Sequence, residues 1–142
     1  MNFTAITQDI LSDNRVQNSE FLKQLCTSTI AMYPNQLPML PWVGYLAEKN
    51  GVFVGTCAFK SSPENGEVEI AYFTFPEYEG QGVATLMAQW LINIANQHGV
   101  SCVKAQTLPE KNASVRILER LNFVFVGSVD HPEDGKVWEW RR

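Results

Sequence analysis

Two glycines stand where an extended segment meets a helical one, in Gly80-Gln81-Gly82-Val83-Ala84. The run before them, residues 67–75, alternates at first and then becomes wholly apolar or aromatic, which is typical of a buried strand. A chain that turns there directly into a helix directs several unpaired backbone N–H groups at one point beside the positive helix end. The loop therefore favours a phosphate ligand, although a tight strand-to-helix turn without any ligand also uses glycines.

The phosphate loops of nucleotide-binding proteins fit this segment poorly. A dinucleotide-binding loop needs a third glycine where Thr85 stands and an acidic residue about twenty positions later, and the region near Gln106 has none. A nucleoside triphosphate loop needs Gly-Lys followed by Ser or Thr, which the sequence lacks. The expected phosphate therefore belongs to another kind of ligand.

Charge is distributed unevenly along the chain. The net charge of −4 disfavours a general nucleic-acid binder, because a phosphate backbone requires a basic face. Residues 1–100 hold four Lys or Arg against nine Asp or Glu, whereas residues 101–142 hold seven against six. This distribution is compatible with an anionic cofactor bound by the C-terminal part and a cationic acceptor bound by the N-terminal part. Chance distribution over a solvated surface is the alternative.

The three cysteines, Cys26, Cys57 and Cys102, are far apart, have apolar neighbours and form no C-x-x-C spacing. They are predicted to be reduced core residues, with no metal site, and a nucleophile made of Cys102 and His98 is the minor alternative. No apolar run approaches the roughly 20 residues of a membrane span, and the start MNFTAITQDI lacks the features of an export signal. We therefore expect one cytoplasmic domain, residues 1–142, with no membrane or nucleic-acid partner.

The helix after the glycine loop is the clearest element. Apolar residues recur with the helical period over residues 83–98, and Gly99 is placed to end the helix. Residues 102–107 have the pattern of a strand, and the order strand, loop, helix, strand predicts that they lie parallel to residues 67–75. A second helix is predicted over residues 113–121.

Turn and cap signals define the other elements. Asn122 suits the left-handed position after the second helix, and strands are predicted at residues 123–126 and 137–141, with a turn at Asp134-Gly135. Near the N-terminus, Ser19–Tyr33 is predicted to form one or two helices with Ser19 as N-cap. Three prolines from Pro34 to Pro41 predict an ordered extended loop, and Asn50-Gly51 predicts a tight hairpin between strands at residues 44–48 and 52–59.

Two motifs resemble those of the GNAT superfamily. The segment from Glu79 to Ala84 is similar to its pyrophosphate loop, Gln/Arg-x-x-Gly-x-Gly/Ala, except that Glu79 stands in the Gln/Arg position. LPEKNASVRILERLNF, from Leu108 to Phe123, is similar to a later helix, Asn-x-x-Ser-x-Arg-x-Leu-Glu-Lys-x-Gly-Phe, especially in ribosomal-protein-alanine N-acetyltransferases. Lys111 holds the usual Asn position there, and Asn122 replaces the Gly. The resemblance extends over Val52–Arg142.

The resemblance implies an α/β fold of the GNAT type. Its mixed, mostly antiparallel twisted sheet has about six or seven strands, with about four helices on both faces, and is splayed at the central parallel pair. It implies acetyl-CoA as co-substrate and direct acetyl transfer to an amine. Backbone groups near Phe73, Thr74 and Phe75 are expected to bind the pantetheine arm. The other implied cofactor-binding residues are Glu79, Gly80, Gln81, Gly82, Val83, Ala84, Thr85, Asn112 and Ser114.

The resemblance also suggests two catalytic side chains. Glu69 matches a position that some relatives use as a base through a water; an ion-paired carboxylate is the alternative, since Glu67 shares its strand face. Leu118 stands where many relatives have a tyrosine that protonates the leaving thiolate. Ser114, the remaining hydroxyl on that helix, becomes the candidate acid, with an ordinary first-turn serine as alternative. Asn112 is either a cofactor ligand or the N-cap of the helix.

The expected activity is therefore acetyl-CoA-dependent acetylation of a protein N-terminus, a lysine or a small-molecule amine. A non-catalytic acyl-CoA-binding or sensing module is the main alternative, because the tyrosine is missing and Glu79 departs from the pattern. A structural domain that binds no cofactor is a third reading. Tyr33, Trp42 and His131, near the expected acceptor region, are predicted to be packing or surface residues. The sequence leaves the acceptor and a homodimer open.

Overall fold

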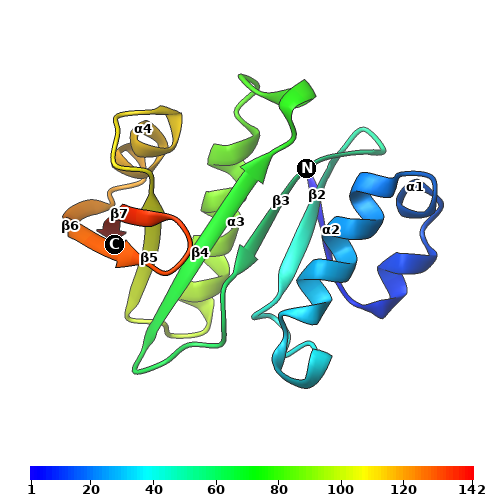
Figure 1. Ribbon diagram of the computed structural model, residues 1–142, viewed down its shortest axis with the longest axis horizontal. Coiled ribbons are helices and arrows are strands. Elements are labelled where there is room, and N and C mark those ends of the chain that lie inside the picture. Colours follow the sequence, from blue (N-terminus) through cyan, green and yellow to red (C-terminus); the bar gives the residue numbers. More distant parts are fainter.

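A twisted sheet of seven strands forms the centre of the computed structural model, which describes residues 1–142 (Figure 1). The strands lie in the order β1-β2-β3-β4-β5-β7-β6. Only β4 and β5 are parallel neighbours, as the sequence predicts, and the mostly antiparallel GNAT-type sheet is confirmed. The bounds are β1 Asn2–Ala5, β2 Gly44–Lys49, β3 Val52–Phe59, β4 Glu67–Thr74, β5 Cys102–Thr107, β6 Val124–His131 and β7 Gly135–Arg141.

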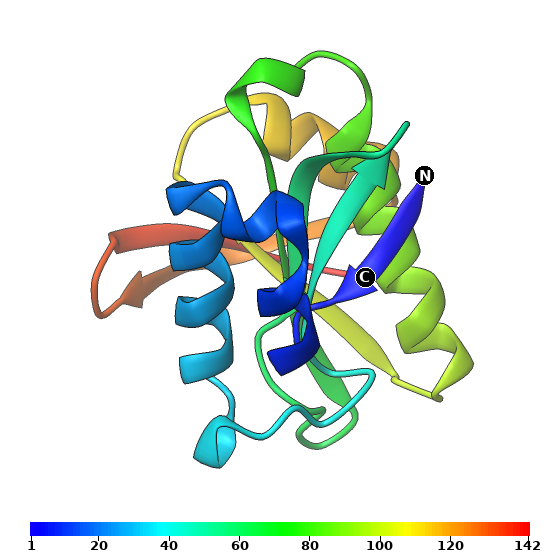
Figure 2. The same cartoon turned by 90° about the vertical axis from the view of Figure 1, so that its right-hand side faces the viewer.

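Four α-helices cover the two faces of this sheet, and Figure 2 shows α2 and α3 on opposite sides of it. The cores explain this arrangement, because alternate residues of a strand point to opposite faces. Val54 belongs to the core beneath α3 and α4, whereas its neighbour Phe53 belongs to the core beneath α1 and α2. The bounds are α1 Asn14–Gln17, α2 Glu20–Ala31, α3 Val83–Gln97 and α4 Ala113–Arg120. No helix combines the length and apolar character needed to cross a bilayer.

The central parallel pair is joined over only part of its length. The register pairs Glu67 with Cys102, Val68 with Val103 and Glu69 with Lys104, and no pairing continues beyond Glu69. β4 itself continues to Thr74, where it remains paired with β3. The carboxyl ends of the two parallel strands therefore separate, which is the predicted splay.

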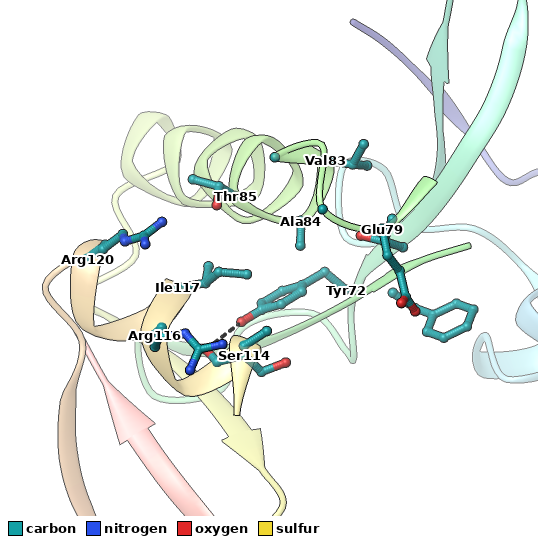
Figure 3. A pocket seen from close by; sticks show the side chains of 14 residues that line it. Tyr72, Glu79, Val83, Ala84, Thr85, Ser114, Arg116, Ile117 and Arg120 are labelled. Carbon is teal, nitrogen blue, oxygen red and sulfur yellow. Dashed lines mark hydrogen bonds between the residues drawn. The ribbon is translucent and has the colours of Figure 1, made fainter. Parts of the chain in front are cut away.

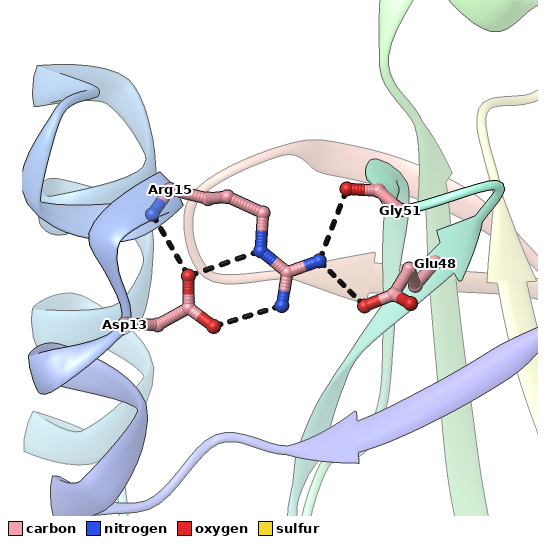
Figure 4. Close-up of polar contacts among 4 residues, drawn as sticks. All are labelled: Asp13, Arg15, Glu48 and Gly51. Atoms are coloured by element: carbon pink, nitrogen blue, oxygen red, sulfur yellow. Dashed lines mark hydrogen bonds and ion pairs between the residues drawn. The ribbon is translucent and has the colours of Figure 1, made fainter.

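A network around Arg15 fastens α1 to the β2–β3 hairpin (Figure 4). The guanidinium donates to both carboxylate oxygens of Asp13, at 3.0 and 2.8 Å, and to Glu48 Oε1 at 2.6 Å. It also donates to the carbonyl of Gly51 at 3.1 Å and lies 4.0 Å from the ring centroid of Phe53. Residues far apart in the sequence are thus held together by one side chain.

Local signals agree with the structure at most turns. Asn50 and Gly51 have φ of 54° and 79° in the predicted hairpin, and Asn122 has φ of 69° after α4. The sequence did not predict β1 and α1, because segments of four residues carry little periodicity. A 3₁₀ turn at Pro34–Gln36 occupies the start of the predicted extended loop, and β6 runs five residues beyond the predicted strand end at Val126, to His131.

Candidate functional site

A cavity of about 580 Å³ opens between the first turn of α3, the end of β4 and one side of α4 (Figure 3). Its position follows from the splay, because β4 and β5 are no longer paired at this level. Its volume lies in the range of pockets that bind cofactors and other small molecules. The lining residues are Tyr72, Phe73, Thr74, Glu79, Gly80, Gly82, Val83, Ala84, Thr85, Ala113, Ser114, Arg116, Ile117 and Arg120.

The N-terminus of α3 is built differently from those of the other α-helices. Asp13, Ser19 and Asn112 cap α1, α2 and α4 through their side chains, whereas the N-cap residue of α3 is Gly82, which has no side chain to cap it. Gly80 and Gly82 have φ of 77° and 78°, and a Cβ on either would meet no atom within 4 Å. The backbone conformation, not lack of room, therefore requires glycine. The first N–H groups of α3 are left for a ligand in the cavity.

The main chain of β4 adds polar groups to the opposite side of the opening. The Phe75 N–H donates to Val54 O at 3.0 Å, and the Glu69 carbonyl accepts from Lys60 N at 2.9 Å, so odd-numbered residues of this segment bond to β3. Neighbouring residues of a strand direct their N–H and C=O groups to opposite sides. The groups of Tyr72 and Thr74 therefore face the opening.

This register refines the expectation for the pantetheine arm. Of the three residues that the resemblance implies, only Thr74 directs its N–H and C=O groups into the opening, because those of Phe73 and Phe75 are directed toward β3. The Phe75 side chain is buried and meets Phe21 edge-on, with ring centroids 5.2 Å apart. Tyr72, which sequence reasoning did not include, takes the second main-chain position.

The Tyr72 side chain reaches across the cavity from β4 to α4 (Figure 3). Its hydroxyl donates to the backbone carbonyl of Ser114 at 3.4 Å. Burial raises the pKa of Tyr72 to about 12, so the hydroxyl keeps its proton at neutral pH. Side chains of alternate strand residues lie on one face, so the positions of Val68 and Ile70 could have placed Tyr72 on the same face of β4. No local sequence signal indicates its contact with α4.

On α4, packing and capping place Ser114 beside the cavity. Asn112 Oδ1 accepts from Val115 N at 3.1 Å, so the predicted N-cap is confirmed, and Asn112 does not line the cavity. Leu118 is fully buried, so the position of the family tyrosine offers no hydroxyl. Ser114 lines the cavity from the first turn of α4.

Arg116 and Arg120 also line the cavity from α4, and Figure 3 shows them on the wall that faces the first turn of α3. Neither guanidinium takes part in an ion pair within the protein. In the sequence, both residues belong to the segment that is similar to the later GNAT helix, and neither was predicted to bind the cofactor. Their spacing of four residues on a predicted helix could have identified them, because it places two cations on one helix face.

Glu69 lies outside the residues that line the cavity. Its Oε2 is 2.9 Å from Lys60 Nζ, and its side chain is 20% exposed. Glu67, on the same strand face, contacts Arg141 at 3.0 Å and Lys104 at 3.5 Å. Both carboxylates are therefore ion-paired on the sheet face opposite the cavity-lining Tyr72, and they stand at the two ends of the short stretch where β4 and β5 are paired.

The three residues near the expected acceptor region have structural contacts. The Tyr33 hydroxyl donates to Ile6 O and accepts from Gly44 N, both at 2.9 Å. Trp42 packs edge-on against Phe59, and His131 Nδ1 accepts two backbone N–H groups of its own turn at 3.1 Å. All three cysteines are free. Cys26 and Cys57 are buried, as predicted, but the prediction of a core position is wrong for Cys102, which is partly exposed.

The predicted cofactor residues fall into two groups. The structure brings together nine of them around the cavity: Phe73, Thr74, Glu79, Gly80, Gly82, Val83, Ala84, Thr85 and Ser114. Phe75, Gln81 and Asn112 lie outside the lining. The lining residues that sequence reasoning did not assign are Tyr72, Ala113, Arg116, Ile117 and Arg120.

Solved structures with the same fold are numerous. An N-acetyltransferase from Staphylococcus aureus Mu50 has a TM-score of 0.61 and 19% identity, over 70% of this chain and 66% of that chain. A ribosomal-protein-alanine N-acetyltransferase from Brucella melitensis has a TM-score of 0.71 and 14% identity, over 100% and 99%. The Salmonella typhimurium protein yncA, solved with its cofactor acetyl-CoA, has a TM-score of 0.66 and 21% identity, over 85% and 72%.

The family itself is identified by the sequence of most of the chain. The family model described as an acetyltransferase (GNAT) domain matches residues 4–124. This range includes the glycine loop, the separated β4 and β5 strands and all of α4. The chain therefore belongs to the GNAT acetyltransferase family.

Proposed function

We propose that the chain is a cytoplasmic, single-domain N-acetyltransferase, residues 1–142, that transfers acetyl directly from acetyl-CoA to an amine. The uncapped N-terminus of α3, facing the cavity where β4 and β5 separate, is the observation that carries this proposal. Family membership supports the reaction type, and the Salmonella typhimurium structure with acetyl-CoA supports the cofactor. Acetyl-CoA supplies the activated acetyl group and the leaving thiolate.

Binding residues are assigned by the chemistry of each part of the ligand. The first turn of α3 and the loop with Gly80 and Gly82 bind the diphosphate. The main-chain groups of Tyr72 and Thr74 hold the amide-containing arm as an added strand would be held. Fixing the thioester beside an amine in this way contributes about 7–11 kcal/mol to catalysis when the geometry is good.

Glu69 is the proposed base, acting through a water on the amine that attacks the thioester carbonyl. At pH 7 an α-amine with a pKa of about 7.7–8.0 is neutral in about one molecule in ten, and a lysine in about one in 2,500, so the base matters more for lysine. We expect Glu69→Gln to lower the rate far more at about pH 7 than at about pH 9. An equal loss at both pH values would remove Glu69 from this role.

Ser114 is the proposed proton donor to the departing thiolate. It lines the cavity, whereas Leu118 is buried and has no proton to donate. We expect Ser114→Ala to slow turnover of acetyl-CoA at saturating acceptor. Normal turnover of this variant would exclude the assignment.

A non-catalytic acyl-CoA-binding module is the second candidate. The buried Leu118 and the Lys60–Glu69 ion pair favour it, because neither position presents an unpaired acid or base to the cavity. This module would bind the same ligand in the same place. Only release of the thiol separates the two candidates.

The deciding experiment measures free CoA produced from acetyl-CoA with a panel of peptide N-termini, lysine peptides and small amines, beside a melting curve. Acceptor-dependent release supports the enzyme and identifies the acceptor class. A cofactor at 100 times its Kd adds about 2.7 kcal/mol to the free energy of unfolding, so binding alone raises the melting temperature. Stabilisation without release favours the binding module, and no stabilisation overturns both.

A further inference from the structure

Arg116 and Arg120, which form no ion pair within the protein, line the cavity opposite the N-terminus of α3. Arg116 and Arg120 are four residues apart on α4, so their side chains lie on one helix face. Both line the cavity together with Ala84 and Thr85 of the first turn of α3. Figure 3 shows the two guanidinium groups on the α4 side of the cavity and Thr85 on the α3 side.

Packing does not account for these side chains. α4 is held to the core by Val115 and Leu118, which are 1% and 0% exposed, whereas both arginines are exposed. The only acidic residue that lines the cavity is Glu79, and it lies across the cavity from Arg120 (Figure 3). The α4 wall therefore carries two positive charges with no carboxylate to balance them.

Their chemistry is that of a phosphate site. A guanidinium offers a planar fork of donors that matches phosphate oxygens, and it is always charged. The positive end of α3 faces the same space and adds to the field. Such an arrangement favours a ligand with more than one negative charge.

We propose that Arg116 and Arg120 bind the phosphate groups of the nucleotide end of acetyl-CoA, and so replace the cationic or amide contact that Glu79 cannot make. The inference rests on the proposed function, since it concerns the same cavity. It assigns the α4 wall to the phosphates and the main chain of β4 to the uncharged arm. Two of the seven Lys or Arg residues in the range 101–142 would then bind the anionic part of the cofactor.

The test measures binding of CoA, dephospho-CoA and pantetheine to the full chain by titration calorimetry, without turnover. Arg116→Gln and Arg120→Gln are each expected to weaken CoA binding about tenfold, because each removes charge-assisted hydrogen bonds, and the double variant more. Binding of pantetheine, which has no phosphate, is expected to stay unchanged. Higher salt should weaken CoA binding by the wild-type chain more than by the double variant.

Lys136→Gln is the matched control, since it also removes one positive charge but lies in β7 outside the cavity. If the arginine variants bind CoA more weakly but bind dephospho-CoA as the wild type does, the arginines contact the 3′-phosphate. If they lose affinity equally for both ligands, the arginines contact the diphosphate. The proposal is overturned if the arginine variants bind CoA like Lys136→Gln, or if they lose pantetheine equally. A wild-type chain that binds no CoA would overturn the proposed function as well.

Discussion

Arginine has two contrasting roles in this molecule, one on each side of the sheet. The Arg15 guanidinium donates to Asp13, Glu48 and the Gly51 carbonyl, and these bonds connect α1 to the β2–β3 hairpin. Arg116 and Arg120 have no ion-pair partner in the protein and line a cavity. A satisfied arginine contributes to folding, whereas an unsatisfied one beside a cavity is available to an anionic ligand. The same residue type therefore predicts stability at one place and binding at the other.

The largest expected effect comes from the residue that holds the α4 wall in place. Leu118→Ala removes a fully buried side chain, and we expect the free energy of unfolding to fall by about 2–5 kcal/mol. Urea denaturation measures this directly. Leu86→Ala on the exposed side of α3 is the control, because Leu86 is 52% exposed and its loss leaves no core cavity. Equal effects of the two variants would show that α4 is not anchored through Leu118.

Removal of Arg15 tests the structural side of the comparison. Arg15→Ala is expected to lower the free energy of unfolding by about 1–2 kcal/mol, since charge-assisted hydrogen bonds are lost but the network is partly solvated. CoA affinity should stay within about twofold of wild type, because the network lies outside the cavity. The control Lys23→Ala breaks an exposed pair at 3.7 Å and should change stability less. A large loss of CoA affinity in Arg15→Ala would contradict the separation of roles.

The pH dependence of stability tests the structural role of Arg15 through its partner Asp13. The hydrogen bond from Arg15 lowers the pKa of Asp13 below its ordinary value of 3.8. A carboxyl whose pKa is depressed by folding stabilises the folded state above its unfolded pKa, and this stabilisation is lost as pH falls through the folded pKa. We therefore expect wild type to lose more stability than Asp13→Asn when pH is lowered from about 5 to below the folded pKa. Parallel pH profiles from denaturant titrations would show that Asp13 makes no contribution.

The smallest effect is expected at the contact between β4 and α4. Tyr72→Phe keeps the ring that lines the cavity and removes only a hydrogen bond of 3.4 Å to the Ser114 carbonyl. The free energy of unfolding should fall by about 0.5 kcal/mol, at the low end for a hydrogen bond, because the contact is long. A loss above about 2 kcal/mol would mean that this hydroxyl, rather than Leu118, holds α4 to the sheet.

Signals that act over a few residues were sufficient for much of the fold. Asn50-Gly51 favours positive φ wherever it occurs, and Ser19 and Asn112 cap helices whose first turns lie beside them. The glycine loop was found in the same way, because Gly82 and the following helix are adjacent in sequence. The resemblance to a known family then connected these elements into one sheet.

The sequence by itself determined the glycine loop, the helices α2, α3 and α4, and the parallel pairing of β4 with β5, since the signals for each lie in a short stretch of chain. Only the tertiary structure decided that Tyr72 meets Ser114, 42 positions away, and that Lys60 pairs with Glu69. Those contacts depend on the strand register and on where β4 and β5 separate, which no local pattern encodes. The unpartnered arginines of α4 became visible for the same reason, because a missing partner can be recognised only when all neighbours have been placed.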